Sequence, residues 1–94
     1  MKRAEVYRLI DAERARQRDK WRAPHRWGSG DCSSNSIAPI VKVAVLSEEC
    51  GEVARNVLDG DDPTAELVQV AAVAVAMVEC IDRGKWWNSK NEDI

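Results

Sequence analysis

The chain has 94 residues, of which 45% are hydrophobic and 32% are charged, and its formal net charge is −2. This length allows one small domain, 1–94, and this composition is typical of a folded globular protein rather than a disordered one. The slightly acidic charge excludes a general nucleic-acid binder, which would need a strongly basic face, so we expect no stable binding to nucleic acid.

The cysteines and the N-terminus indicate the cellular compartment of the protein. Cys32, Cys50 and Cys80 are odd in number and contain no C-x-x-C pair, which argues against a disulfide framework and a zinc site. The first residues are charged and amphipathic and show no apolar signal-peptide segment. We therefore expect a cytoplasmic protein with reduced thiols.

Hydrophobic periodicity and turn residues predict an all-α fold with three helices. The first covers residues 2–19 and is followed by a loop over 21–36, where proline, glycine and serine interrupt every period. The second and third helices cover 37–58 and 63–82, and residues 84–94 form a tail. The loop is long for so small a domain, and loops of that length are usually functional.

Three turn residues set the expected helix ends. Ser36 is a good N-cap for the second helix, and Gly60 supplies a left-handed residue after it. Asp62 is the expected N-cap of the third helix, with Pro63 in its first position. Because the connection is so short, the second and third helices should pack as an antiparallel hairpin.

The third helix is apolar nearly all round, from Leu67 to Ile81. It is shorter than a membrane span and is interrupted by Gln69 and Glu79, so we expect a buried helix and no membrane association. A helix of this kind must be covered on all sides, which one hairpin and a thin first helix cannot do. The pattern therefore predicts a homodimer or homotetramer with a four-helix-bundle core.

The hairpin brings a set of polar side chains to one level. With the turn centred near residues 60–61, Glu52 lies level with Gln69, and Glu66 lies about 4.5 Å further along the axis. Glu49 precedes Glu52 by three residues, so the two share a helix face. Carboxylates gathered among apolar residues repel one another unless a cation neutralises them, and Mg²⁺ prefers oxygen ligands of this type. The alternative is a solvated helix face with ordinary ion pairs to Arg55.

The acidic pattern also resembles a known family. Glu48-Glu49-x-x-Glu52, a gap of 13 residues and then Glu66-x-x-Gln69 on a helical hairpin resemble the MazG-like all-alpha nucleotide pyrophosphohydrolases, which include the dimeric dUTPases and dCTP pyrophosphatases. The resemblance is greatest to short phage-type members, through the opening ERARQRDKW of residues 13–21 and the third-helix segment ELVQVAAVA of residues 66–74. It covers roughly residues 13–82.

This resemblance implies Mg²⁺-dependent hydrolysis of a nucleoside triphosphate to the monophosphate and pyrophosphate, with Mn²⁺ as an alternative ion. Glu49, Glu52 and Glu66 match the family's metal-binding carboxylates, and Glu48 matches an acid that can position or deprotonate the attacking water. The family's last ligand is usually Asp, whereas this chain has Gln69, whose amide oxygen can coordinate a metal but brings no charge.

The substrate-binding candidates come from the basic loop and from the second helix. Trp21 and His25 resemble a Trp-x-x-x-His region that frames the base, although Trp21 could equally cap the core and His25 could lie on the surface. Lys20 belongs to a cluster of basic residues over 14–26 that can clamp a triphosphate, and Lys42 lies on the Glu49 side of its helix. For both lysines the ordinary alternative is a solvated charge.

Two other classes of function fit the same residues. One is a non-catalytic module that binds nucleotide or metal at a site degenerated at Gln69. The other is a structural helical module whose only task is dimerisation. Metal binding to the native state must raise its stability, so a metal-dependent rise in melting temperature separates a structural module from the other two.

Overall fold

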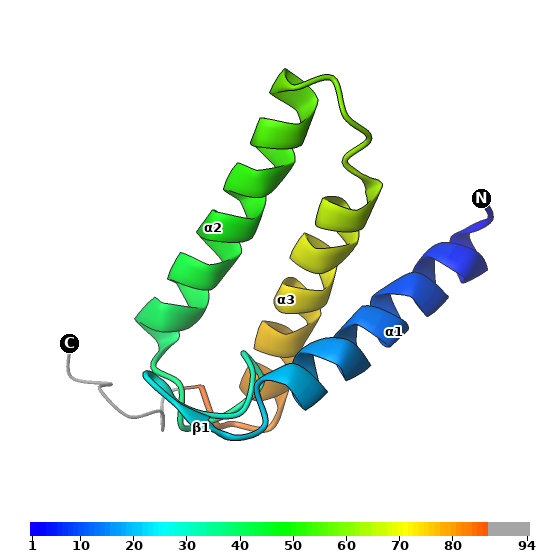
Figure 1. Ribbon diagram of the computed structural model, residues 1–94. Coiled ribbons are helices and arrows are strands. Elements are labelled where there is room, and N and C mark those ends of the chain that lie inside the picture. Colours follow the sequence, from blue (N-terminus) through cyan, green and yellow to red (C-terminus); the bar gives the residue numbers. More distant parts are fainter. Residues whose placement is uncertain (87–94) are drawn as a thin grey trace.

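The computed structural model describes residues 1–86 and shows three helices, with a long loop between the first two and a short turn between the last two (Figure 1). Helix α1 spans Arg3–Lys20, α2 spans Pro39–Leu58 and α3 spans Thr64–Asp82. The all-α prediction is confirmed, and each helix begins and ends within two residues of its expected bounds. Residues 84–86 of the expected tail follow α3, and its remainder, residues 87–94, lies outside the described residues.

Helix α3 is the central element of the fold. Both α1 and α2 pack against α3, and within residues 1–86 they do not pack against each other (Figure 1). The buried positions of α3 are Ala72, Val73, Ala76 and Cys80. Three of these four side chains are small, so neighbouring helices can approach the α3 backbone closely.

The hairpin of α2 and α3 closes as predicted, with a one-residue difference where α3 begins. Gly60 has a φ of 78°, the left-handed conformation that ends α2. The Asp62 carboxylate accepts hydrogen bonds from the backbone N–H and the hydroxyl of Thr64, at 3.0 and 2.7 Å. The predicted N-cap is therefore wrong by one residue: Pro63 occupies the N-cap position without a side-chain cap, the helix begins at Thr64, and Asp62 bonds to Thr64 from just before the cap.

The register of the hairpin can be checked at its far end. A turn centred near residues 60–61 places Lys42 level with residue 79, and the Lys42 ammonium lies 3.1 Å from the Sγ of Cys80, one residue away. This contact, made by the end of a long side chain, agrees with the predicted antiparallel packing of α2 on α3.

The connection between α1 and α2 is a folded loop, and the prediction that Ser36 caps α2 is wrong. The loop contains two short antiparallel strands, β1 (Pro24–His25) and β2 (Gly28–Ser29), which the sequence did not predict. Helix α2 starts after Ala38, because the Ser36 hydroxyl is engaged within the loop instead. It accepts a hydrogen bond from the Ser29 N–H at 2.9 Å and donates to the Ser29 carbonyl at 2.7 Å.

Gly28 allows this loop to close. Its φ is 138°, and a Cβ atom at this position would lie 2.7 Å from the carbonyl oxygen of Ser36. Any side chain would therefore collide with the backbone that leads into α2. The close approach fixes the loop against the start of α2, which is where the candidate site forms.

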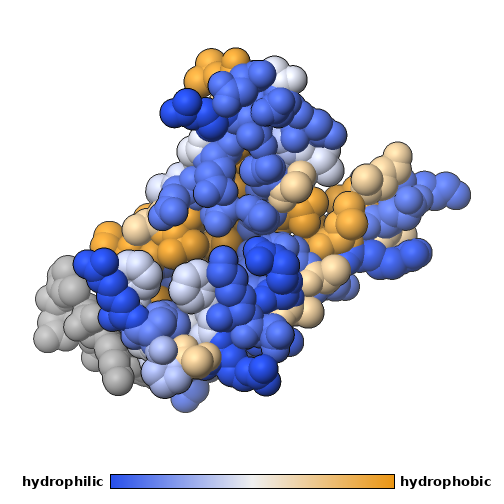
Figure 2. Space-filling model, viewed as in Figure 1, coloured by the Kyte–Doolittle hydropathy of each residue, from blue (hydrophilic) through white to orange (hydrophobic). Residues whose placement is uncertain are grey.

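Much apolar surface remains uncovered in the single chain. Figure 2 shows it over the N-terminal half of α2 and again between α3 and α1. Exposed aliphatic side chains on the two hairpin helices are Ile40, Val43, Val57, Leu58, Leu67, Val75, Val78 and Ile81. By length and composition α3 could cross a membrane, a property that it shares with core helices of soluble proteins, yet only 22% of its apolar stretch is buried within the chain.

Candidate functional site

A cavity of about 220 Å³ opens between the C-terminal half of α1, the loop and the N-terminal half of α2. It exists because α1 and α2 rest on α3 without touching each other, so that Val73 of α3 forms part of its lining. Its polar and aromatic lining residues are Arg16, Gln17, Lys20, Trp21, His25, Trp27, Asp31, Cys32, Glu48 and Glu49. The cavity thus places cationic and aromatic side chains from one part of the chain opposite carboxylates from another.

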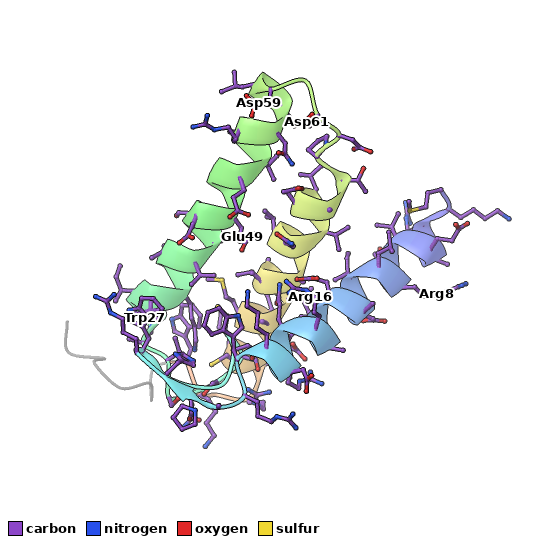
Figure 3. All side chains as sticks on the ribbon, in the orientation of Figure 1. Arg8, Arg16, Trp27, Glu49, Asp59 and Asp61 are labelled. Atoms are coloured by element: carbon purple, nitrogen blue, oxygen red, sulfur yellow. The ribbon has the colours of Figure 1, made fainter. Side chains whose placement is uncertain are left out.

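The α2 side of the cavity follows a regular helical stripe. Val41, Val45 and Glu48 are spaced by four and three residues, so they lie on one helix face. Glu49 lies beside this stripe and also lines the cavity, and Figure 3 shows it on the inner side of α2. Both residues predicted to be catalytic, Glu48 and Glu49, therefore reach the same cavity.

The α1 side of the cavity carries an ordered guanidinium group. The Nε and Nη2 atoms of Arg16 each lie 2.7 Å from a carboxylate oxygen of Glu13, and Gln17 donates to the same carboxylate at 3.1 Å. The hydrogen bond from Arg16 keeps the pKa of Glu13 low despite partial burial. This paired geometry orients Arg16 at the cavity, where its charge also interacts with that of Glu49.

The loop side of the cavity is aromatic. The rings of Trp21 and His25 meet edge to face at 5.3 Å, and those of His25 and Trp27 at 6.4 Å. His25 Nε2 lies 2.9 Å from the carbonyl oxygen of Gly30, and His25 Nδ1 accepts from the Trp27 N–H at 3.3 Å. These contacts assign the proton to Nε2, so His25 orders the loop and also lines the cavity.

The predicted substrate residues on α1 and the loop come together, whereas Lys42 does not join them. Lys20, Trp21 and His25 all line the cavity, and the Lys20 ammonium lies 5.2 Å from the centre of the Trp21 ring. Lys42 is fully buried at the interface with α3. It follows Val41 on the helix, so its side chain is rotated by about 100° from the cavity-lining stripe.

The Glu49 carboxylate of the candidate site has a raised pKa. Burial raises its pKa, and the negative charges of Glu52, Glu48 and Glu13 raise it further. Its Oε2 atom is buried and has no hydrogen-bond partner within residues 1–86. An unpartnered carboxylate oxygen of this kind is destabilising unless a cation or a donor satisfies it.

The remaining predicted metal ligands lie outside the cavity. Glu52 interacts with Glu49 along α2, and Glu66 and Gln69 belong to the start of α3. The Oε2 atom of Glu66 is, like that of Glu49, buried without a partner in the described part of the chain. Among residues 1–86 no group of three or more His, Cys, Asp or Glu side chains is arranged to hold a metal ion.

A buried ion-pair network holds the loop side of the site in place, and the sequence did not predict it. Arg14 of α1 donates to Asp31 of the loop at 2.6 Å and to Glu79 of α3 at 2.8 Å. Burial alone would raise the pKa of Asp31, but hydrogen bonds from Ser33 and Arg14 outweigh it and lower that pKa. The interruption of an apolar helix by Glu79 was the signal in the sequence, but its partners are far away along the chain.

No protein family, curated protein or solved structure matches this chain. The cavity is therefore the feature that bears on function. Its polar lining is a cationic and aromatic wall facing carboxylates, one of which has an unsatisfied oxygen.

Proposed function

We propose that the protein is a Mg²⁺-dependent nucleoside triphosphate pyrophosphohydrolase of the MazG-like type, which converts a (d)NTP and water to the (d)NMP and pyrophosphate. The observation that carries the proposal is a single cavity lined by Arg16 and Lys20, by aromatic rings, and by Glu48 and Glu49. Nucleotides need these three kinds of contact, because their phosphates are anionic, their bases are flat and their hydrolysis needs an activated water.

The aromatic and the cationic sides of the cavity have different roles in this reaction. Trp21, His25 and Trp27 border the cavity and offer surfaces against which a base can pack. Arg16 and Lys20 supply positive charge for the phosphates and for the pyrophosphate leaving group. Two hydrogen bonds to the Glu13 carboxylate already orient Arg16.

The carboxylates act on water and on the metal. Glu48 and Glu49 lie within the cavity, where a carboxylate can orient water and accept its proton. The unpartnered oxygens of Glu49 and Glu66 suit a hard cation, and Glu52 and Gln69 are the further candidate ligands. Bound Mg²⁺ would supply charge neutralisation and a more acidic water.

The exposed apolar face of α2 and α3 supports assembly into a homodimer or homotetramer. Aliphatic side chains such as Val75, Val78 and Ile81 are more than two-fifths exposed on the most apolar helix of the chain. Packing them against a second copy would remove this surface from water, which is the main driving force of association. The free thiols of Cys32, Cys50 and Cys80 fit the cytoplasmic location expected from the sequence.

Purified protein, shown to be folded by circular dichroism, should release pyrophosphate from at least one member of a panel of ribo- and deoxyribonucleoside triphosphates when Mg²⁺ is present. Chelation by EDTA should abolish release. Glu48→Gln and Glu49→Gln are the matched variants, because each removes a charge at nearly constant volume. Folded protein that releases no pyrophosphate from any nucleotide, with either Mg²⁺ or Mn²⁺, would refute the proposal.

The second candidate is a binding module without turnover, which the amide at Gln69 favours. Such a module would still bind nucleotide in the cavity and would still gain stability from it. A nucleotide-dependent rise in melting temperature without pyrophosphate release selects this reading. A chain that responds to neither nucleotide nor metal has a purely structural role.

A further inference from the structure

A lysine and a cysteine meet inside the protein where α2 packs on α3. The side chains of Lys42 and Cys80 are both fully buried, and the Lys42 ammonium nitrogen donates to the Cys80 sulfur across 3.1 Å. The two residues are 38 positions apart along the chain and belong to different helices. A nucleophilic nitrogen and an oxidisable sulfur are therefore held in contact by the fold itself.

The surroundings of this pair make the amine unusual. Lys42 forms no ion pair with a carboxylate within residues 1–86, and its nitrogen lies 4.9 Å from the centre of the Trp86 ring. Placing an amine in the interior is unfavourable unless it is well satisfied, and an apolar side chain of similar length would fill the same space. The amine at position 42 thus needs an explanation beyond packing.

We propose that Lys42 and Cys80 are a redox-sensitive pair that a peroxide converts into a covalent nitrogen–sulfur bond between α2 and α3. In the first step the thiol is oxidised by the peroxide to a sulfenic acid, and one water is released. In the second step the Lys42 ammonium gives one proton to water, the freed lone pair attacks the sulfur, the S–O bond breaks, and the hydroxide leaves as water with a second proton from the nitrogen. Counted from the uncharged amine and thiol, the net change is the loss of two hydrogens from the protein.

The geometry favours this outcome over further oxidation of the sulfur. A sulfenic acid at Cys80 forms next to an amine that already lies in contact, so the second step needs no large movement. Formation of the bond closes a covalent loop that contains the turn between α2 and α3. The cross-link therefore restricts the unfolded chain and holds the helices that carry Glu49 and Glu66 in register.

The other two cysteines provide internal comparisons. Cys50 is exposed on α2 and is open to ordinary oxidation by solvent peroxide. Cys32 is partly buried, and burial raises the pKa of its thiol to about 11. Neither of them has a lysine partner among the hydrogen bonds of the described residues, so a cross-link to an amine is expected at Cys80 alone.

The test treats the full-length chain with hydrogen peroxide and follows it by intact mass and by peptide mapping without reductant. We expect a species lighter by two hydrogens, a peptide joining the segments around Lys42 and Cys80, and recovery of the starting mass after treatment with dithiothreitol. The cross-linked species should also melt at a higher temperature than the reduced protein. A Cys50→Ser background removes oxidation at the exposed thiol.

Two lysine variants separate the proposal from simple thiol oxidation. Lys42→Met keeps the length of the side chain, and Lys42→Arg keeps the positive charge but offers a poor nucleophile. Variants that circular dichroism shows to be folded should lose the joined peptide while Cys80 oxidises to its acids. In the parent protein, an unmodified Cys80, a Cys80 oxidised to sulfinic acid without the joined peptide, or a bond to another residue would overturn the proposal.

Discussion

Replacing Arg14 by methionine should destabilise the protein strongly, because Arg14 is the shared donor of a buried network. Its side chain is 6% exposed and that of Asp31 is 5% exposed, whereas that of Glu79 is 39% exposed. Removing one partner of a buried ion pair typically costs about 3–5 kcal/mol, since the other charge stays buried without compensation. Because water can reach Glu79, the lower end of this range applies, and we expect the free energy of unfolding to fall by about 3 kcal/mol.

Urea denaturation at constant protein concentration measures this loss. With an m-value of about 1 kcal/mol/M, the midpoint should fall by about 3 M, and the melting temperature should fall by about 12 °C or more. Arg22→Met is the matched control, because Arg22 forms its ion pair with Asp19 in the open, where both side chains are more than three-quarters exposed. That variant should unfold close to the parent.

The pH dependence provides an independent check on the same network. Because the pKa of Asp31 is lowered in the folded state, its stabilising contribution is present above the unfolded value of 3.8 and is lost as the pH falls through the lower folded value. The difference between the parent and Arg14→Met should therefore shrink in acid. A loss below about 1 kcal/mol at neutral pH, in the range of exposed pairs, would refute the reasoning.

Three further predictions concern the candidate site and its supporting loop. Glu49→Gln should raise the melting temperature without Mg²⁺ and should remove any Mg²⁺-dependent rise. Because the pKa of Glu49 is raised in the folded state, the variant's gain in stability over the parent should grow as the pH increases from 4.5. A variant less stable than the parent at neutral pH would contradict this. Gln69→Asp should strengthen Mg²⁺ binding, measured by calorimetry, and activity that appears only in this variant would favour the non-catalytic reading of the native chain. Gly28→Ala should destabilise the protein by about 1–3 kcal/mol or more, because alanine disfavours the positive φ at this position and its Cβ would clash with Ser36. Gly51→Ala, where no atom lies within 4 Å of the added Cβ, should stabilise α2 by roughly 0.5–1 kcal/mol. Equal urea midpoints for the two variants would contradict the loop geometry.

The helices could be predicted from the sequence because their signals are local. The apolar run of α3 and the glycine after α2 each act within a few residues, and the short turn then dictates the hairpin and its register. The Lys42–Cys80 contact joins the two helices of this hairpin. The same reasoning expected Glu48 to point about 100° away from Glu49 and to be peripheral, yet both residues line the cavity.

The loop and the cavity depend on contacts between residues that are distant in the sequence. Ser36 has the features of an N-cap, but its hydroxyl is taken by Ser29, a partner that no local rule identifies. Lys42 lies near the level expected from the sequence, yet one step around the helix turns it from the cavity toward Cys80. The role of Arg14 could not be predicted because its two partners lie in the loop and at the end of α3.

The surroundings of Glu49 support the proposed site over the alternative of a solvated helix face. A solvated carboxylate on a helix would keep its ordinary pKa, whereas burial and the three acids Glu52, Glu48 and Glu13 raise the pKa of Glu49, and one of its oxygens is buried without a partner. Glutamine or leucine at this position would avoid the repulsion, so the carboxylate lowers stability as the chain stands. Residues that lower stability in a cavity are characteristic of binding and catalytic sites, where a ligand reverses the penalty. A cation or nucleotide that binds this cavity should therefore gain part of its affinity by relieving the repulsion at Glu49.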